Sequence, residues 1–168
     1  MRVSSTVKTA LLLCNGLFDI YLPGKLDVKT ATIEHVVPRS KCNLGISDPH
    51  NLWLTNGRLN SVRSNFDFAD LPAAPPRDMM YMDPFTLQMV PVAGHCAMGV
   101  YPCVSFSERT FYPPTRSKGI IARAYLHLGK DSPLMLRWHE RHPSEPFEVE
   151  RARLLSRSTG VRHRVLNV

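Results

Sequence analysis

Two short stretches of the sequence hold side chains that could hydrolyse a phosphodiester bond. Glu34 and His35 stand together in the first stretch, and Asn60 and Arg63 stand three residues apart in the second. Histidine can take a proton from water near neutral pH, because its unperturbed pKa lies there. Carboxylate and amide oxygens suit a hard divalent cation, which would neutralise charge on the leaving oxygen. An arginine could complete the site by clamping the phosphate.

A strand–strand–helix order would bring these residues together. Residues 30–37 are rich in β-prone side chains and predict a strand, and residues 52–55 predict a second, shorter one. A helix is expected from about residue 56 to 65. Residues three apart share one face of a helix, so Asn60 and Arg63 would point the same way. The sequence therefore predicts a small unit of two strands and a helix around the candidate site.

The adjacent positions of Glu34 and His35 raise a geometric difficulty. Successive side chains of a regular strand point to opposite faces of the sheet. Both residues can serve one site only where the chain leaves regular strand geometry. Pro38, three residues further on, favours such a departure.

The rest of the chain alternates helical patterns with irregular segments. Helices are expected over residues 4–20 and 116–128, where apolar residues recur at helical spacing, and over residues 133–141. A last helix is expected over residues 144–160, where Ser144 could cap its start and Gly160 could end it. Residues 70–92 hold five prolines and predict an irregular covering loop, and a further strand is expected within residues 95–106. We therefore predict an α+β protein. Residues 1–168 would form a single domain, with a metal-site core at about 30–66, the covering loop at about 70–92 and a helical C-terminal part at about 116–160.

The charge balance points to an anionic polymer as partner. There are 21 Lys and Arg residues against 14 Asp and Glu, a net charge of +7, and fifteen of the 21 are arginine. Arginine forms two-pronged hydrogen bonds to phosphate, so nucleic acid is the first candidate. No apolar run approaches the roughly 18 residues that a membrane helix needs, so we expect no membrane association.

The N-terminus and the cysteines bear on the compartment. The first 20 residues hold only a short apolar stretch, with no evident cleavage site, so we expect a first helix rather than a signal peptide, and an intracellular protein. Cys96 and Cys103 are close enough to be bridged, although buried free thiols are the simpler interpretation. The sequence contains no C-x-x-C pair, so a zinc ribbon is not expected.

Three motifs stand in order along the first half of the chain. They are Glu34-His35-Val36-Val37-Pro38, Asp48-Pro49-His50-Asn51-Leu52 and Asn60-Ser61-Val62-Arg63-Ser64-Asn65. They resemble the E-H-x-x-P, D-x-H-N-L and N-x-x-R-S-N patterns of the endonuclease I family of non-specific nucleases, within the His-Me finger (ββα-metal) superfamily. The segment 118–125 is similar to the family's K/R-G-x-x-A-R-x-Y helix. The resemblance covers about residues 30 to 160.

The resemblance implies a fold, a reaction and roles for three residues. The fold would be a ββα-metal core packed with several further helices. His35 would be the general base, and Glu34 and Asn60 would hold one Mg²⁺, for which Mn²⁺ or Ca²⁺ could substitute. The products would carry 5′-phosphate and 3′-hydroxyl ends. The substrate would be DNA, with RNA as a further candidate, cut with little sequence preference because contacts go to the phosphate backbone.

Several roles stay open between alternatives. Arg63 would either bind phosphate or anchor its helix to Glu34 or Asp48. The family usually carries a phosphate-binding arginine between its first two motifs, and Arg39 and Lys41 are the candidates in that short interval.

The second motif is expected to support the site rather than to bind metal. Asp48 and Asn51 would fix the turn, and His50 would be a hydrogen-bonded support, although histidine with aspartate is also common in metal sites. For the whole chain, the alternative function is a basic nucleic-acid-binding or packaging protein on a catalytically silent nuclease fold. The oligomeric state is not predicted.

Overall fold

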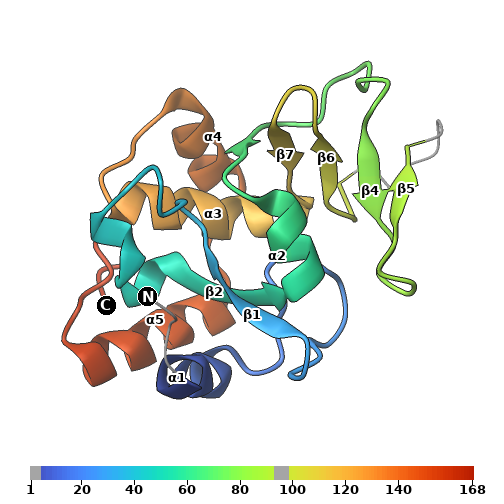
Figure 1. The fold of residues 1–168 in the computed structure, drawn as a ribbon. Coiled ribbons are helices and arrows are strands. Elements are labelled where there is room, and N and C mark those ends of the chain that lie inside the picture. The colour runs from blue at the N-terminus through green and yellow to red at the C-terminus, as the bar shows by residue number, and fades with distance from the viewer. Residues whose placement is uncertain (1–4, 93–98) are drawn as a thin grey trace.

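The computed structural model of the protein describes residues 5–92 and 99–168. Within these ranges the chain forms five α-helices, two 3₁₀ helices and seven short strands (Figure 1). In chain order they are α1 (Ser5–Asn15), β1 (Ala31–His35), η1 (Leu44–Ile46), η2 (Pro49–Asn51), β2 (Leu52–Asn56), α2 (Gly57–Arg63), β3 (Asp67–Phe68), β4 (Met80–Met82), β5 (Met89–Pro91), β6 (Cys103–Ser105), β7 (Thr110–Tyr112), α3 (Thr115–His127), α4 (Pro133–Arg141) and α5 (Pro146–Thr159). The α+β prediction is confirmed.

The predicted strand–strand–helix unit is present in β1, β2 and α2. β1 pairs with β2 in antiparallel register, which sets Glu34 opposite Trp53. α2 follows β2 without a loop, and Asn56 forms the cap between them. Its side-chain oxygen accepts a hydrogen bond of 2.9 Å from the amide of Arg58, satisfying one of the free donors at the helix start. The cap fixes the direction in which α2 leaves β2, and α2 also packs against β1.

A five-stranded sheet beside α2 is the main departure from the prediction. Its strand order is β3-β7-β6-β4-β5, with β3 parallel to β7 and the other neighbours antiparallel. The predicted covering loop over residues 70–92 is wrong in part, because it contains β4 and β5. The prolines lie before β4, in the turn and at the end of β5, which has only one paired neighbour. Proline is tolerated at such edge positions, so its density did not exclude strands of three residues.

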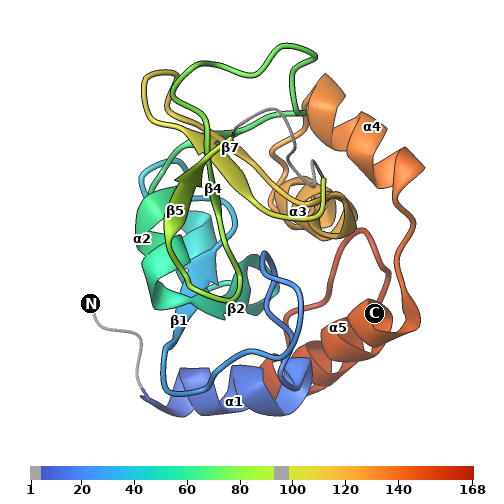
Figure 2. The same ribbon diagram turned by 90° about the vertical axis from the view of Figure 1, so that its right-hand side faces the viewer.

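The other four α-helices of the described chain lie in two groups. α1 and α5 lie next to each other at one end of the molecule, and α3 and α4 pack together near the other (Figures 1 and 2). α1 is shorter than the predicted helix over residues 4–20. It ends at Asn15 because Gly16 adopts a left-handed backbone with φ of 58°.

The main hydrophobic core joins the sheets to α2, α3 and α4. Fully buried members include Trp53, Leu59, Phe111, Ile121 and Trp138. None of the helices that the structure describes is both long and apolar enough to cross a membrane. Cys96, and with it the question of a bridge to Cys103, lies outside the described residues.

Candidate active site

An open groove of about 520 Å³ lies between the end of β1 and the exposed side of α2. Glu34 and His35 both line this groove, although both lie in the paired part of β1. The expected departure from strand geometry begins only after His35, where the chain bends at the next two residues. Other lining residues come from the following turn and from α2, namely Arg39, Ser40, Asn60, Ser64 and Asn65.

The amide of Asn60 is held in one orientation by β1. Its Nδ2 donates to the Thr32 hydroxyl at 3.0 Å and to the Ile33 carbonyl at 2.9 Å. Both amide protons are therefore used, which assigns the other terminal atom as the oxygen. Oδ1 has no hydrogen-bond partner within residues 5–92 and 99–168, and the residue lines the groove. Asn60 thus offers a fixed oxygen that can accept a hydrogen bond or bind a cation.

The carboxylate of Glu34 is anchored through one oxygen. Oε1 accepts a hydrogen bond of 2.8 Å from the Tyr21 hydroxyl and lies 3.1 Å from Nε of Arg63, a contact that is an ion pair without hydrogen-bond alignment. Oε2 has no protein partner in the described part of the chain. Burial raises the pKa of the Glu34 carboxyl above its usual value, while Arg63 and then Tyr21 act in the opposite direction. A buried carboxylate with one free oxygen favours binding of a cation.

The two free oxygens fit a magnesium site. Glu34 and Asn60 provide one carboxylate and one amide oxygen on the same groove, and Mg²⁺ is commonly held by one or two such ligands while keeping several waters. No cluster of three or more His, Cys, Asp or Glu side chains suited to a metal occurs in the described ranges. A site formed by one Glu, one Asn and several waters is not such a cluster, because it has only two protein ligands.

The imidazole of His35, a residue that lines the groove, has one nitrogen that can accept a proton. Nε2 lies 3.0 Å from the carbonyl oxygen of Ile46, which can only accept, so Nε2 carries the proton and Nδ1 does not. Burial lowers the pKa of His35, and the charge of Arg39 acts in the same direction, against the Ile46 hydrogen bond. The ring is therefore neutral at pH 7, as a general base must be.

The three candidate phosphate-binding cations lie in different settings. Arg63 is 1% exposed and forms an ion pair with Glu34. It also donates to the carbonyls of Val36 and Ser64 at 2.7 Å. These contacts are those of an anchor for the helix rather than of a residue that binds phosphate. Lys41 forms an ion pair of 2.5 Å with Asp67 and does not line the groove. Arg39 lines the groove, is exposed, and has no ion pair in the described ranges.

Residues of the second motif, Asp48 to Leu52, form hydrogen bonds with the chain that follows His35. Asn51 is fully buried, and its side chain accepts from the amide of Val37 at 2.7 Å and donates to the carbonyls of Val37 and Gly45. Asp48 caps η2 by accepting from the amide of His50 at 2.9 Å. These contacts fix the chain just after His35.

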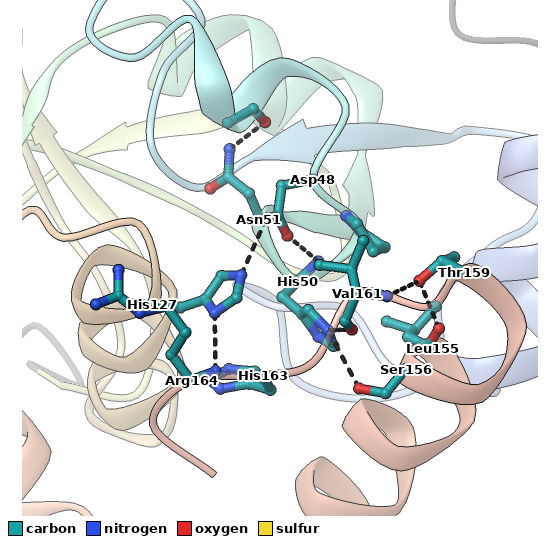
Figure 3. A network of polar contacts seen from close by, with 12 residues as sticks. Asp48, His50, Asn51, His127, Leu155, Ser156, Thr159, Val161, His163 and Arg164 are labelled. Atoms are coloured by element: carbon teal, nitrogen blue, oxygen red, sulfur yellow. Dashed lines mark hydrogen bonds and ion pairs between the residues drawn. The ribbon is translucent and has the colours of Figure 1, made fainter. Parts of the chain in front are cut away.

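His50 belongs to a buried group of three histidines (Figure 3). The ring centroids of His50, His127 and His163 are 4.8 to 5.0 Å apart, and the residues are at most 5% exposed. His50 Nε2 contacts the Val161 carbonyl at 2.7 Å, and His127 Nδ1 accepts from the Arg164 amide at 3.1 Å. The His50 bond is a donation to a carbonyl, whereas Nδ1 of His163 accepts from the amides of Val165 and Leu166 and can do so only while it is unprotonated.

We expect the free energy of unfolding to fall as the pH drops below about 6.5. Burial lowers the pKa of His163 to about 3 and also lowers that of His50, with the charges of Arg151 and Arg123 acting in the same direction on His163. Between pH 6.5 and about pH 3, His163 is protonated in the unfolded chain but not in the folded one. The free energy of unfolding therefore falls as the pH falls. For His163 the loss between pH 7.5 and 5 is about 2 kcal/mol. Asp48, bonded to His127 at 2.9 Å, is the carboxylate facing the group.

Urea unfolding of the wild type and of His163→Asn at both pH values measures this effect. The asparagine oxygen can replace Nδ1, which accepts from the amides of Val165 and Leu166, but it cannot be protonated. The variant should lose about 2 kcal/mol less than the wild type on acidification. His139→Asn, on α4 outside the group, should behave like the wild type. An equal acid loss in both variants would contradict the assignment.

Sequence reasoning missed two residues that hold the site. Tyr21 is fully buried and donates to Glu34, and burial raises its pKa well above the usual value, so its hydroxyl stays a donor. Asp19 is 3% exposed and accepts from the Thr55 hydroxyl at 2.7 Å and the Asn56 amide at 2.9 Å, which fixes the corner between β2 and α2. Neither belongs to the three motifs, and nothing local in the sequence placed them near the groove.

Comparison with known proteins identifies relatives that share these motifs. Residues 27–131 match the family described as Endonuclease I, and this range contains Glu34, His35 and Asn60. An extracellular deoxyribonuclease of Aeromonas hydrophila is 30% identical over 83% of this chain and 67% of its own length. A periplasmic deoxyribonuclease of the same organism is 29% identical over 83% of this chain and 65% of its length. The chain thus spans about two thirds of these relatives.

A third relative extends the range of organisms, and the relatives correct one prediction. Endonuclease-1 of Buchnera aphidicola subsp. Acyrthosiphon pisum is 28% identical over 65% of this chain and 40% of its own length. The prediction of an intracellular protein is wrong, because the relatives named above as extracellular and periplasmic point to secretion instead. That prediction depended on the apolar stretch at the N-terminus, which forms α1 and is uninformative about compartment. The family match over more than half of the chain, together with the ordered motifs, shows that this chain belongs to the endonuclease I family.

Proposed function

We propose that the protein is a Mg²⁺-dependent endonuclease that hydrolyses DNA with little sequence preference, and that RNA is a further substrate. The carrying observation is that Glu34, Asn60 and His35 all line one groove, and that one acceptor atom of each has no protein partner in the described ranges. The family supports nuclease activity, and relatives named deoxyribonucleases support DNA as the substrate.

Each of the three residues has a distinct task in this proposal. Nδ1 of His35 takes a proton from a water that attacks phosphorus, while the Ile46 carbonyl keeps the ring aligned and its Nε2 protonated. Oε2 of Glu34 and Oδ1 of Asn60 would hold the cation. When bound, Mg²⁺ supplies neutralisation of the charge that develops on phosphate and the leaving 3′-oxygen. The products would carry 5′-phosphate and 3′-hydroxyl ends.

Contacts within the protein hold Glu34 and Asn60 in place before a substrate binds. Tyr21 and Arg63 fix the carboxylate of Glu34, and β1 fixes the amide of Asn60. Because these groups need no rearrangement when the substrate arrives, the geometry favours stabilisation of developing charge. The groove is open and Arg39 lies on its wall, which suits a polymer held through its phosphates rather than a small molecule enclosed in a pocket.

Incubation of the protein with supercoiled plasmid in Mg²⁺, with and without EDTA, tests the proposal. We expect cleavage only with the metal, and a continuous smear of products rather than discrete fragments. Single-stranded RNA in a parallel sample tests the second substrate. Binding of the plasmid without cleavage in Mg²⁺ would instead support the basic nucleic-acid-binding protein on a silent nuclease fold. Discrete fragments would overturn the lack of sequence preference.

Replacement of Asn60 by alanine should raise the Mg²⁺ requirement. The change removes one of two proposed protein ligands, so we expect half-maximal cleavage to need at least about tenfold more Mg²⁺, by analogy with the loss of groups around a metal. The measurement is the initial cleavage rate across a Mg²⁺ titration. Asn43→Ala, an exposed asparagine outside the groove, is the control and should match the wild type. An unchanged Mg²⁺ dependence in Asn60→Ala would remove this residue from the site.

A further inference from the structure

Arg109 lies on the turn between β6 and β7, far from the three motifs in sequence, and contacts a residue of the groove. Its Nη2 donates a hydrogen bond of 3.0 Å to Oδ1 of Asn65, a residue that lines the groove. Asn65 in turn donates at 3.4 Å to the hydroxyl of Ser40, which also lines the groove. A cation is thereby connected, through one side chain, to the wall of the site.

The backbone and the guanidinium of Arg109 are both held in place. The Arg109 amide donates to the Phe106 carbonyl at 3.3 Å, and its own carbonyl accepts from the Asp67 amide at 3.2 Å. The residue has φ of 51°, a left-handed conformation that side chains other than glycine seldom adopt. The guanidinium carbon lies 5.1 Å from the centre of the Phe66 ring. An arginine stacked on an aromatic ring loses less freedom when it binds a second group.

The charge of Arg109 is not neutralised by the surrounding protein. It is exposed and forms no ion pair in the part of the chain that the structure describes. Lys41 and Lys118, by contrast, are paired with Asp67 and Asp70. The contact with Asn65 uses a single N–H group of Arg109, which leaves further donors free for a two-pronged contact with a phosphate.

We propose that Arg109 binds a backbone phosphate of the substrate next to the scissile one and thereby positions the strand along the groove. The inference rests on the proposed nuclease function, and it adds a contact from the five-stranded sheet to a site otherwise built by β1, β2 and α2. A purely structural arginine would tie the turn to the end of α2 and nothing more. The two roles are separable, because only the first depends on the positive charge.

Arg109→Gln tests the first role, because glutamine keeps a side-chain N–H donor but carries no charge, and only the loss of charge changes the salt dependence of binding. Binding to a fluorescein-labelled DNA duplex is measured in EDTA, where no cleavage occurs, between 50 and 200 mM NaCl. We expect about five- to tenfold weaker binding at 0.1 M salt and a slope of log K against log salt that is smaller by about one. In Mg²⁺, KM for plasmid should rise in the same proportion while kcat stays within about twofold.

Arg157→Gln is the matched control, because Arg157 is an exposed arginine on α5 outside the groove. It removes the same charge and should leave the salt slope nearly unchanged. If both variants bind DNA equally well and with the same salt slope while the wild type still cleaves, Arg109 has no role in phosphate binding. The proposed nuclease function would then be unaffected. Failure of the wild type to bind or cleave DNA would overturn the proposed function and this inference with it. A lower thermal midpoint in Arg109→Gln with unchanged salt slope would establish the structural role instead.

Discussion

Replacing His35 with alanine is expected to slow DNA cleavage about 100- to 10,000-fold, the usual contribution of a positioned general base. Nδ1 is the only unprotonated nitrogen of the ring, and it belongs to a residue that lines the groove with Glu34 and Asn60. No other histidine lines this groove among the residues described, so no side chain of the same kind can replace it. The rate is best measured in single turnover at saturating Mg²⁺, where binding does not limit it.

Two controls separate the loss of the base from a loss of structure. Imidazole added to the solution can enter the space left by the side chain, and it should restore part of the rate of His35→Ala but not change that of the wild type. DNA binding in EDTA should be retained, because the substitution removes no positive charge at pH 7. A variant that cleaves at close to the wild-type rate would require a different base.

The second large effect concerns stability and the helical part of the chain. We expect Arg123→Ala to lower the free energy of unfolding by about 3–5 kcal/mol, because it leaves a buried carboxylate without its partner. Arg123 on α3 pairs with Glu148 on α5 through two contacts of 2.6 and 2.7 Å, and both side chains are at most 5% exposed. A third donor reaches the His142 carbonyl at 2.7 Å. The pair connects α3, α5 and the end of α4.

An exposed pair on α5 provides the matched control. Arg153 lies 2.5 Å from Glu150, but their side chains are 43% and 52% exposed. Exposed pairs of this kind contribute about 0–1 kcal/mol, so Arg153→Ala should have a small effect on unfolding. The combined change of Arg123→Met and Glu148→Leu removes both buried charges and should recover much of the loss. Chemical unfolding that gives Arg123→Ala and Arg153→Ala the same small loss would contradict this account of the buried pair.

The elements around the site were predictable because their signals are local. The β-prone run before Pro38, the asparagine cap and the helical spacing of Asn60 and Arg63 all lie within a few residues of each other. The same locality explains the success with α3, α4 and α5, whose signals lie within helices of 13, 9 and 14 residues. Motif order then supplied the family.

The five-stranded sheet was not predictable in the same way. β4 and β5 have three residues each and are bounded by prolines, so neither gives an alternating pattern long enough to recognise. β3 has two residues and pairs in parallel with β7, more than 40 positions further along the chain. Such pairings are decided by packing of the whole core rather than by local preference.

The contacts that complete the site share this long-range character. Tyr21 reaches Glu34 across 13 positions, and Arg109 reaches Asn65 across 44. A tyrosine or arginine has no sequence signal for a partner at such a separation. The predicted ligands could therefore be named from motifs, whereas the residues that orient them required the fold.

Diffraction from crystals soaked in Mn²⁺, measured at the manganese absorption edge, locates the bound cation. We expect one strong anomalous peak in the groove, in contact with both Oε2 of Glu34 and Oδ1 of Asn60, and no peak there in crystals of Asn60→Ala. The same peak should disappear when Mg²⁺ is added in large excess. A groove without a peak at saturating Mn²⁺, or a peak held by the histidines 50, 127 and 163 instead, would contradict the assignment of this groove as the metal-dependent active site.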